Sequence, residues 1–228
     1  MVSSPLTSAL LFHIGPVAIT RSVVTTWAIM AALAILCPVL TRRLAILPGS
    51  RQAVLEGIVG GIMDQIEDVT RRDPRPFLPL LGTLFIFLVV ANLAGVLPGV
   101  EAPTGRIETP AALSLIVFFS VHYFGIRSRG LRGYLASFVE PSPIMLPLNI
   151  LAEITRTFSL TVRLFGNMMS GEFVIGLVLA LAGLFVPIPL MALEILVGVV
   201  QAYIFTVLAT AFIATAVGAP PANDTYRH

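Results

Sequence analysis

The chain has 228 residues, of which 57% are hydrophobic and 11% are charged, and its mean hydropathy is +0.95. Soluble domains contain about 25% charged residues, so a soluble fold of this length is excluded and lipid must be the solvent for most of the surface. The formal net charge of +2 is too small to indicate a nucleic-acid partner. A disulfide framework is also excluded, because Cys37 is the only cysteine.

The N-terminal third of the chain shows two different helical patterns. Residues 23–40 form a continuous apolar run that is long enough to span a bilayer and ends before two arginines. In residues 51–72, apolar side chains recur at helical spacing while acidic side chains fall largely on the other side. This second pattern predicts an amphipathic helix that lies on the membrane surface.

Four further apolar runs follow, separated by DPRP, by a polar loop, by EPSP and by VPIP. We therefore predict an all-α integral membrane protein that forms a single transmembrane domain over residues 1–228. Besides the surface helix it has about five membrane-embedded helices, at residues 23–40, 77–97, 111–126, 144–186 and 190–217.

The distribution of arginine predicts the orientation of these helices. Two loops are rich in arginine, and the loop between them contains only Arg106; the arginine-rich positions are Arg42, Arg43, Arg51, Arg71, Arg72 and Arg75, and then Arg127, Arg129 and Arg132. By the positive-inside rule the arginine-rich loops are cytoplasmic, so the N-terminus is outside and the C-terminus is inside. The first basic residue is Arg21, so we expect no cleavable signal.

The run at residues 144–186 is too long for a perpendicular helix. As one helix it would measure roughly 65 Å, about twice the apolar thickness of a bilayer. Either it breaks at Gly166, Gly171 and Gly176, or it is steeply tilted. We favour the tilt, because few residues here would end a helix, and the same holds less acutely for residues 190–217.

Arg163 lies near the middle of this long run, where insertion of an arginine costs roughly 2.5 to 3.5 kcal/mol. It belongs to a polar stripe at helical spacing that consists of Arg156, Ser159, Arg163, Asn167 and Ser170. Glu172 is about 180° away around the helix, so the two charges cannot pair along one face. Two interpretations follow: a structural ion pair with a distant glutamate, or a functional charge.

Two other classes of membrane protein are weighed against the sequence. An intramembrane enzyme needs a nucleophile beside a base, or a metal cluster, and no buried His/Asp or His/Cys grouping occurs here. A stand-alone carrier usually shows inverted repeats and broken helices, and we find no repeat.

In the last apolar run, Glu194 and Gln201 are seven residues apart and share one helix face.

Several segments together resemble one family. RLFGNMMSGE at residues 163–172, preceded by ITRTFSLTV, is similar to the motif of subunit a of F-type ATP synthases, the stator of the proton-driven rotor. Supporting segments are ANLAGVLPG at residues 91–99, LPLNILAEI at 146–154 and QAYIFTVLATAF at 201–212. The resemblance covers most of the chain.

The resemblance implies a non-catalytic subunit with two offset half-channels that lead to and from a carboxylate on the rotor. Arg163 matches the arginine that drives deprotonation of this carboxylate and blocks leak between the half-channels. Many bacterial members have one glutamate and one histidine at the two outer positions, where this sequence has two glutamates. By position, the remaining pathway residues are Asn167 and Gln201 beside the arginine, Glu172 and Glu194 in the outer half-channel, and Glu153 toward the inner half-channel.

The same resemblance implies the partners and the location. The expected partners are the c-ring, against which the two last helices would tilt, the b-type peripheral stalk subunits and the lipid bilayer, in a bacterial inner membrane. The translocated ion is expected to be the proton, and its flow is expected to be coupled to ATP synthesis. A sodium-translocating version stays open, because ion selectivity would be set mostly on the c-ring. No cofactor and no metal are implied.

Overall fold

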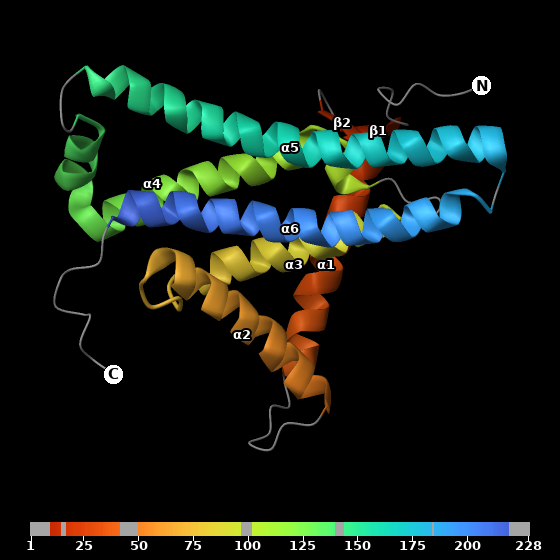
Figure 1. The fold of residues 1–228 in the computed structure, drawn as a ribbon, viewed down its shortest axis with the longest axis horizontal. Helices are drawn as coiled ribbons and strands as arrows, with labels where there is room; N and C mark the ends of the chain where they lie inside the picture. The colour runs from red at the N-terminus through yellow and green to blue at the C-terminus, as the bar shows by residue number, and fades with distance from the viewer. Residues whose placement is uncertain are drawn as a thin grey trace. The chain divides into compact units, whose positions relative to one another are not determined.

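The structure is a computed structural model that describes residues 10–14, 17–41, 50–96, 102–139, 144–183 and 185–218. Helices dominate it (Figure 1), with the bounds α1 (Arg21–Thr41), α2 (Ser50–Thr70), α3 (Leu78–Ala94), α4 (Glu108–Val139), α5 (Met145–Ala182) and α6 (Pro187–Val217). A short 3-10 helix, η1 (Pro103–Gly105), precedes α4. The predicted all-α fold is confirmed. Within the described ranges, α1, α4, α5 and α6 are long and apolar enough to cross a membrane, and α3 is a shorter apolar helix.

A small hairpin at the N-terminal end was not predicted from the sequence. Strand β1 (Leu10–Ile14) pairs with the antiparallel strand β2 (Val17–Thr20), and α1 follows directly. Both strands are rich in aliphatic and β-branched residues, which favour extended structure. The run 23–40 was recognised because of its length, whereas these shorter segments fall below the length that a helix prediction needs.

Helix α4 is longer than the third predicted span, which ended at residue 126. It extends through three arginines to Val139 and is interrupted at Gly130, whose φ of 73° is not helical. Arginine is a good helix former, so a cluster of arginines ends a membrane span without ending the helix. The interruption falls on glycine because positive φ is sterically allowed there.

Helix α5 is continuous over 38 residues, and none of its glycines has a positive φ. The alternative in which this run breaks at Gly166, Gly171 or Gly176 is therefore wrong. At 1.5 Å per residue the helix is about 57 Å long, compared with about 30 Å for the apolar core of a bilayer. The turn into α6 includes Gly183, with a φ of 79°.

The chain divides into two compact units, each assembled from three segments. The first comprises Met1–Leu44, Phe85–Ala112 and Thr161–Tyr203, and the second comprises Ala45–Leu84, Leu113–Leu160 and Ile204–His228. In the first unit, the later part of α5 and the earlier part of α6 run antiparallel (Figure 1). Buried side chains of its core include Phe87, Leu88, Ala91, Leu164, Met168 and Ala202. Those of the second unit include Ile66, Leu81, Val117, Phe205 and Ile213.

In the second unit, polar side chains hold the C-terminal end of α6. The Arg72 guanidinium donates to the carbonyl of Gly218 at 3.2 Å. From α4, the Arg129 Nε donates to the carbonyl of Val217 at 3.2 Å, and the Ser128 hydroxyl donates to the same oxygen at 3.5 Å. The last carbonyls of a helix have no partners within it and carry partial negative charge, so arginines stabilise them.

Candidate functional site

Arg163 lies on the side of α5 that the rest of its unit does not cover. Its side chain is exposed, whereas the nearby Leu164 and Met168 are 1% and 2% exposed and anchor another side of the helix in the core. No hydrogen bond or ion pair joins Arg163 to another residue in the described part of the chain. The guanidinium therefore faces outward from α5, where lipid or another protein of the membrane could contact it.

Glu172 is also on α5, and its carboxylate lies against η1. A Cβ added to Gly105 would stand 2.8 Å from Oε1 and 3.0 Å from Oε2 of Glu172. Any larger residue at position 105 would therefore need the carboxylate to move. The sequence alone did not indicate this contact, because Gly105 lies in the loop between two apolar runs.

Glu194 on α6 makes an equally close approach to α5. Its carboxylate occupies the space that a Cβ on Gly171 would need. Gly171 directly precedes Glu172, so the Glu194 carboxylate reaches the α5 backbone at the residue next to the other acidic position. Glu194 is half-buried and Glu172 is exposed. The structure thus brings η1, α5 and α6 together around these two carboxylates.

A buried asparagine on α3 fixes the position of η1 within the same unit. The Asn92 amide donates to the carbonyl of Gly198 on α6 at 2.8 Å, and its oxygen accepts from the Thr104 hydroxyl at 2.9 Å. Asn92 is 2% exposed and Thr104 is fully buried. A Cβ on Gly198 would lie 3.0 Å from that of Asn92, so glycine permits this close approach.

Asn92 and Thr104 were not among the predicted site residues. The sequence signal that could have identified Asn92 is a lone amide within an otherwise apolar run, since polar groups in membrane helices need partners. Its partner on α6 is 106 residues away and follows no periodicity, so only the fold reveals it.

Gln201 lies one turn beyond Gly198 on α6 and is 7% exposed. Among the described residues, its Nε2 has no hydrogen-bond partner. A buried amide without a partner is rare in native proteins and indicates a role or a missing water. Asn167, on α5 one turn after Arg163, is half-buried.

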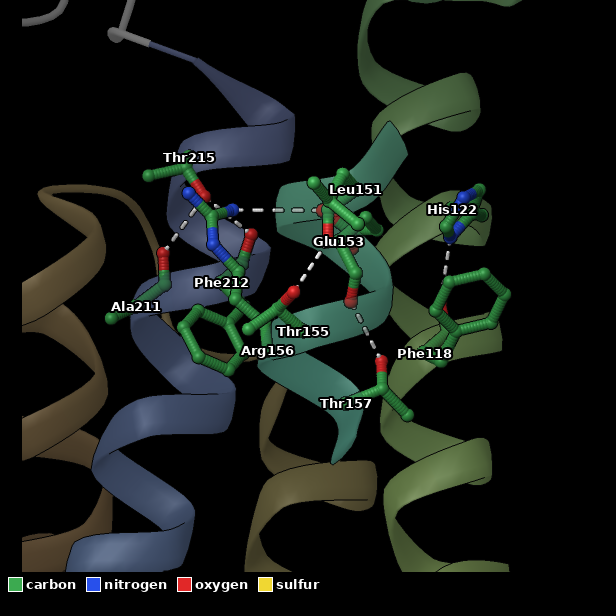
Figure 2. Close-up of polar contacts among 10 residues, drawn as sticks. All are labelled: Phe118, His122, Leu151, Glu153, Thr155, Arg156, Thr157, Ala211, Phe212 and Thr215. Carbon is green, nitrogen blue, oxygen red and sulfur yellow. Dashed lines mark hydrogen bonds and ion pairs between the residues drawn. The ribbon is translucent and has the colours of Figure 1, made fainter. Parts of the chain in front are cut away.

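Glu153 belongs to the second unit, unlike the other five predicted residues, which all belong to the first. Figure 2 shows its carboxylate beside the Arg156 guanidinium, with a separation of 3.6 Å, and Arg156 over the ring of Phe212 of α6 at 5.4 Å. These side chains line a cavity of about 260 Å³. Its polar lining also includes Arg129, Tyr134, Ser137, Asn149 and Thr215.

His122 on α4 lies near this cavity without lining it. Its Nδ1 is 2.8 Å from the carbonyl of Phe118, one turn earlier in the same helix. Its ring contacts Phe118, Tyr134 and Phe138. Within the described ranges, no three His, Cys, Asp or Glu side chains are arranged to hold a metal ion.

Comparison with known proteins adds an independent observation. Residues 23–214 match the protein family described as "ATP synthase A chain". The chain is similar to "ATP synthase subunit a 2" of Bradyrhizobium sp., with 82% identity over 218 residues, which are 96% of this chain and 98% of the relative. It is 50% identical to "ATP synthase subunit a" of Albidiferax ferrireducens over 204 residues, 89% of this chain and 88% of the relative. It is 48% identical to "ATP synthase subunit a 2" of Pelobacter propionicus over 211 residues, 92% of each chain.

Proposed function

Because the chain belongs to the ATP synthase A chain family, we propose that it conducts protons through two offset half-channels to and from the carboxylates of a rotating c-ring. It is a non-catalytic, multi-pass membrane subunit of the F-type ATP synthase, the proton-conducting stator. The flow of protons past it turns the ring, and rotation drives ATP synthesis elsewhere in the complex.

The observation on which this proposal chiefly rests is the outward guanidinium of Arg163, which pairs with none of the described residues. A permanent charge in a membrane helix is expensive unless it has a function. At about 4 Å and an effective dielectric constant near 20, it would stabilise an ionised carboxylate on the ring by roughly 4 kcal/mol. Each arriving carboxylate then releases its proton. The fixed positive charge also repels protons that would otherwise pass directly between the half-channels.

The cluster of Glu172, Glu194 and η1 is the proposed outer half-channel. Two carboxylates on neighbouring helices can pass a proton between them, directly or through one water. Asn92 supports this arrangement, because its hydrogen bonds connect η1 to α6 and so hold both sides of the cluster. We assign Gln201 and Asn167 to the path between the outer glutamates and Arg163. The Gln201 Nε2, which has no hydrogen-bond partner among the described residues, would bind a water there.

The cavity around Glu153 is the proposed inner half-channel. Its polar lining and volume of about 260 Å³ leave room for several waters. Glu153 would take up protons from these waters or release them there. The Arg156 guanidinium lies between the Glu153 carboxylate and the Phe212 ring, so the carboxylate has a fixed partner at the wall of the cavity.

The proposed orientation places the N-terminus outside and the C-terminus in the cytoplasm of a bacterial cell, because the arginine-rich loops are cytoplasmic. The proposed partners are the c-ring and the b-type peripheral stalk. Helix α1 has room for a partner helix or lipid, because it exposes large apolar side chains, among them Trp27, Met30, Ile35 and Val39.

Reconstitution of the whole complex tests this function. Liposomes that contain it should synthesise ATP when a proton gradient and a membrane potential are imposed in sodium-free buffer. Synthesis that requires added sodium would identify the sodium-translocating alternative. Absence of synthesis with either ion, by a complex that hydrolyses ATP normally, would contradict the proposal.

A further inference from the structure

The second unit contains another cavity, of about 320 Å³, that the proposed proton path does not use. It lies where the segment between α2 and α3, the middle of α4 and the end of α6 meet. The residues that line it are Arg72, Pro76, Phe77, Tyr123, Phe124, Arg127, Ser128 and Val217. Its volume is at the lower end of the range for small-molecule sites, roughly 300 to 1,000 Å³.

The charge of this cavity is positive. Two arginines line it, and none of the described residues in its lining is acidic. Hydroxyl groups stand beside the guanidiniums: Arg127 donates to the Tyr123 hydroxyl at 2.8 Å, and Arg72 donates to the Ser128 hydroxyl at 3.5 Å. Guanidinium groups are strong donors to phosphate oxygens, because they can bind them in a bidentate geometry.

The remaining walls are apolar and aromatic. Phe77 and Phe124 are in ring contact, with centroids 4.9 Å apart, and Pro76 and Val217 complete this side. A free inorganic anion gains nothing from such walls, whereas the glycerol part of a lipid does. Arg127 and Tyr123 also lie where the sequence predicts the end of a membrane span, and basic and aromatic residues at that level face lipid headgroups.

We propose that this cavity binds the phosphate of one anionic phospholipid, whose acyl chains extend into the bilayer beside α3 and α4. The two guanidiniums bind the phosphodiester oxygens, and the aromatic walls contact the glycerol. The ligand chemistry is that of a phosphate group, and the lipid is favoured over a free anion because of the apolar walls.

Arg127 is the residue to test. Arg72 also binds the end of α6 through the Gly218 carbonyl, so its replacement would disturb the fold. Arg127 is exposed, and its guanidinium donates to the Tyr123 hydroxyl within one turn of α4. Arg132 supplies a matched control, because it is an exposed arginine on the same helix that does not line the cavity.

The experiment uses the purified whole complex, depleted of lipid in detergent. A photoactivatable phosphatidylglycerol is titrated in, and labelled peptides that cover residues 72–77 and 123–128 are quantified. Phosphatidylcholine with the same acyl chains, soluble glycerol phosphate and inorganic phosphate serve as competitors. Arg127→Gln and Arg132→Gln are compared with the parent complex, and ATP-driven proton pumping reports that each complex is intact.

We expect phosphatidylglycerol to label these peptides in preference to phosphatidylcholine. Arg127→Gln should raise the concentration for half-labelling about fivefold, which corresponds to ~1 kcal/mol for one arginine. Arg132→Gln should leave it within about twofold. Equal labelling by both lipids, or no response to Arg127→Gln in an intact complex, would overturn the proposal. Complete displacement of the lipid by millimolar inorganic phosphate would also overturn it, in favour of a free-anion site.

Discussion

The carboxylate of Glu194 on α6 lies against the backbone of Gly171 on α5, in the space that a Cβ would occupy. An acidic side chain on one membrane helix thus reaches the residue that precedes another acidic position, Glu172. Glycine at position 171 is required for this approach, because every other residue would place an atom where the carboxylate is. A substitution at position 171 can therefore test whether the position of the Glu194 carboxylate matters for the proposed outer half-channel.

Gly171→Ala should displace the Glu194 carboxylate without preventing assembly, because the end of a glutamate side chain can move. A displacement of about 1 Å at a proton-transfer site can lower its rate up to a hundredfold, so ATP-driven pumping in vesicles should fall about ten- to a hundredfold. Gly176→Ala is the control, since an added Cβ there meets nothing within 4 Å. Equal pumping by the two variants would show that the Glu194 position does not matter for flux.

Replacement of both outer carboxylates tests whether they act together in one proton relay. We predict that Glu172 and Glu194 lie within one water of each other and share a proton. The single Gln variants and the double variant should then lower proton flux by similar factors, because residues in one relay are not additive. Passive flux through the membrane sector in vesicles measures this. Independent, multiplicative losses, or unchanged flux in the double variant, would contradict the shared relay.

Arg163→Ala separates a functional charge from a structural ion pair. The complex should insert and assemble, because removal of a charge makes insertion easier, whereas ATP-driven pumping should vanish and passive leak should rise. Arg163→Lys should restore little activity, because a lysine enclosed between α5 and the ring can lose its proton. If Arg163 were half of a structural pair, its loss would destabilise the subunit by roughly 3 to 5 kcal/mol. Poor assembly of Arg163→Ala would support that alternative, and normal pumping would refute the mechanism.

Asn92→Leu should destabilise the first unit. The change removes the bonds to the Gly198 carbonyl and the Thr104 hydroxyl, and a stranded buried polar group costs about 1–3 kcal/mol. The melting temperature of the purified complex should drop, and pumping should drop with it as η1 loses its support. Ser120→Ala is a suitable control, because this hydroxyl donates to the Ile116 carbonyl within its own helix turn and joins no other described segment. A melting temperature equal to that of the control would show that the network does not support the unit.

The lengths of α5 and α6 predict their inclination in the membrane. Helices of 38 and 31 residues exceed the number needed to span a bilayer, about 20 residues, so both should be steeply tilted along the surface of a rotor. An experimental structure of the complex in a lipid nanodisc would measure the angles. Inclinations of less than about 20° from the membrane normal would contradict this prediction.

The helices were predictable from the sequence because each apolar run meets the same physical requirement. A backbone in lipid must satisfy its own hydrogen bonds, so long apolar runs become helices. The outcome at α4 shows the limit of this reasoning. The arginines after residue 126 have no preference for ending a helix, and the interruption occurs at Gly130 for a steric reason instead.

The candidate site was predictable only where one helix determines the geometry. The position of Glu172 opposite Arg163 follows from the helical repeat, and so does the shared face of Glu194 and Gln201. The contact of Glu172 with Gly105 and the bonds of Asn92 join segments far apart in the chain. No local pattern encodes such contacts, which depend on how three helices pack.

The hydrogen bonds at the end of α6 have a consequence for how the subunit is made. The side chains that donate hydrogen bonds to the carbonyls at this helix end are Arg72, Ser128 and Arg129. All of them precede α6 in the chain. They therefore emerge from the ribosome and enter the membrane before α6 exists. Helix α6 therefore meets donors that are already in place, and its C-terminal carbonyls can be bound as soon as the helix enters the membrane.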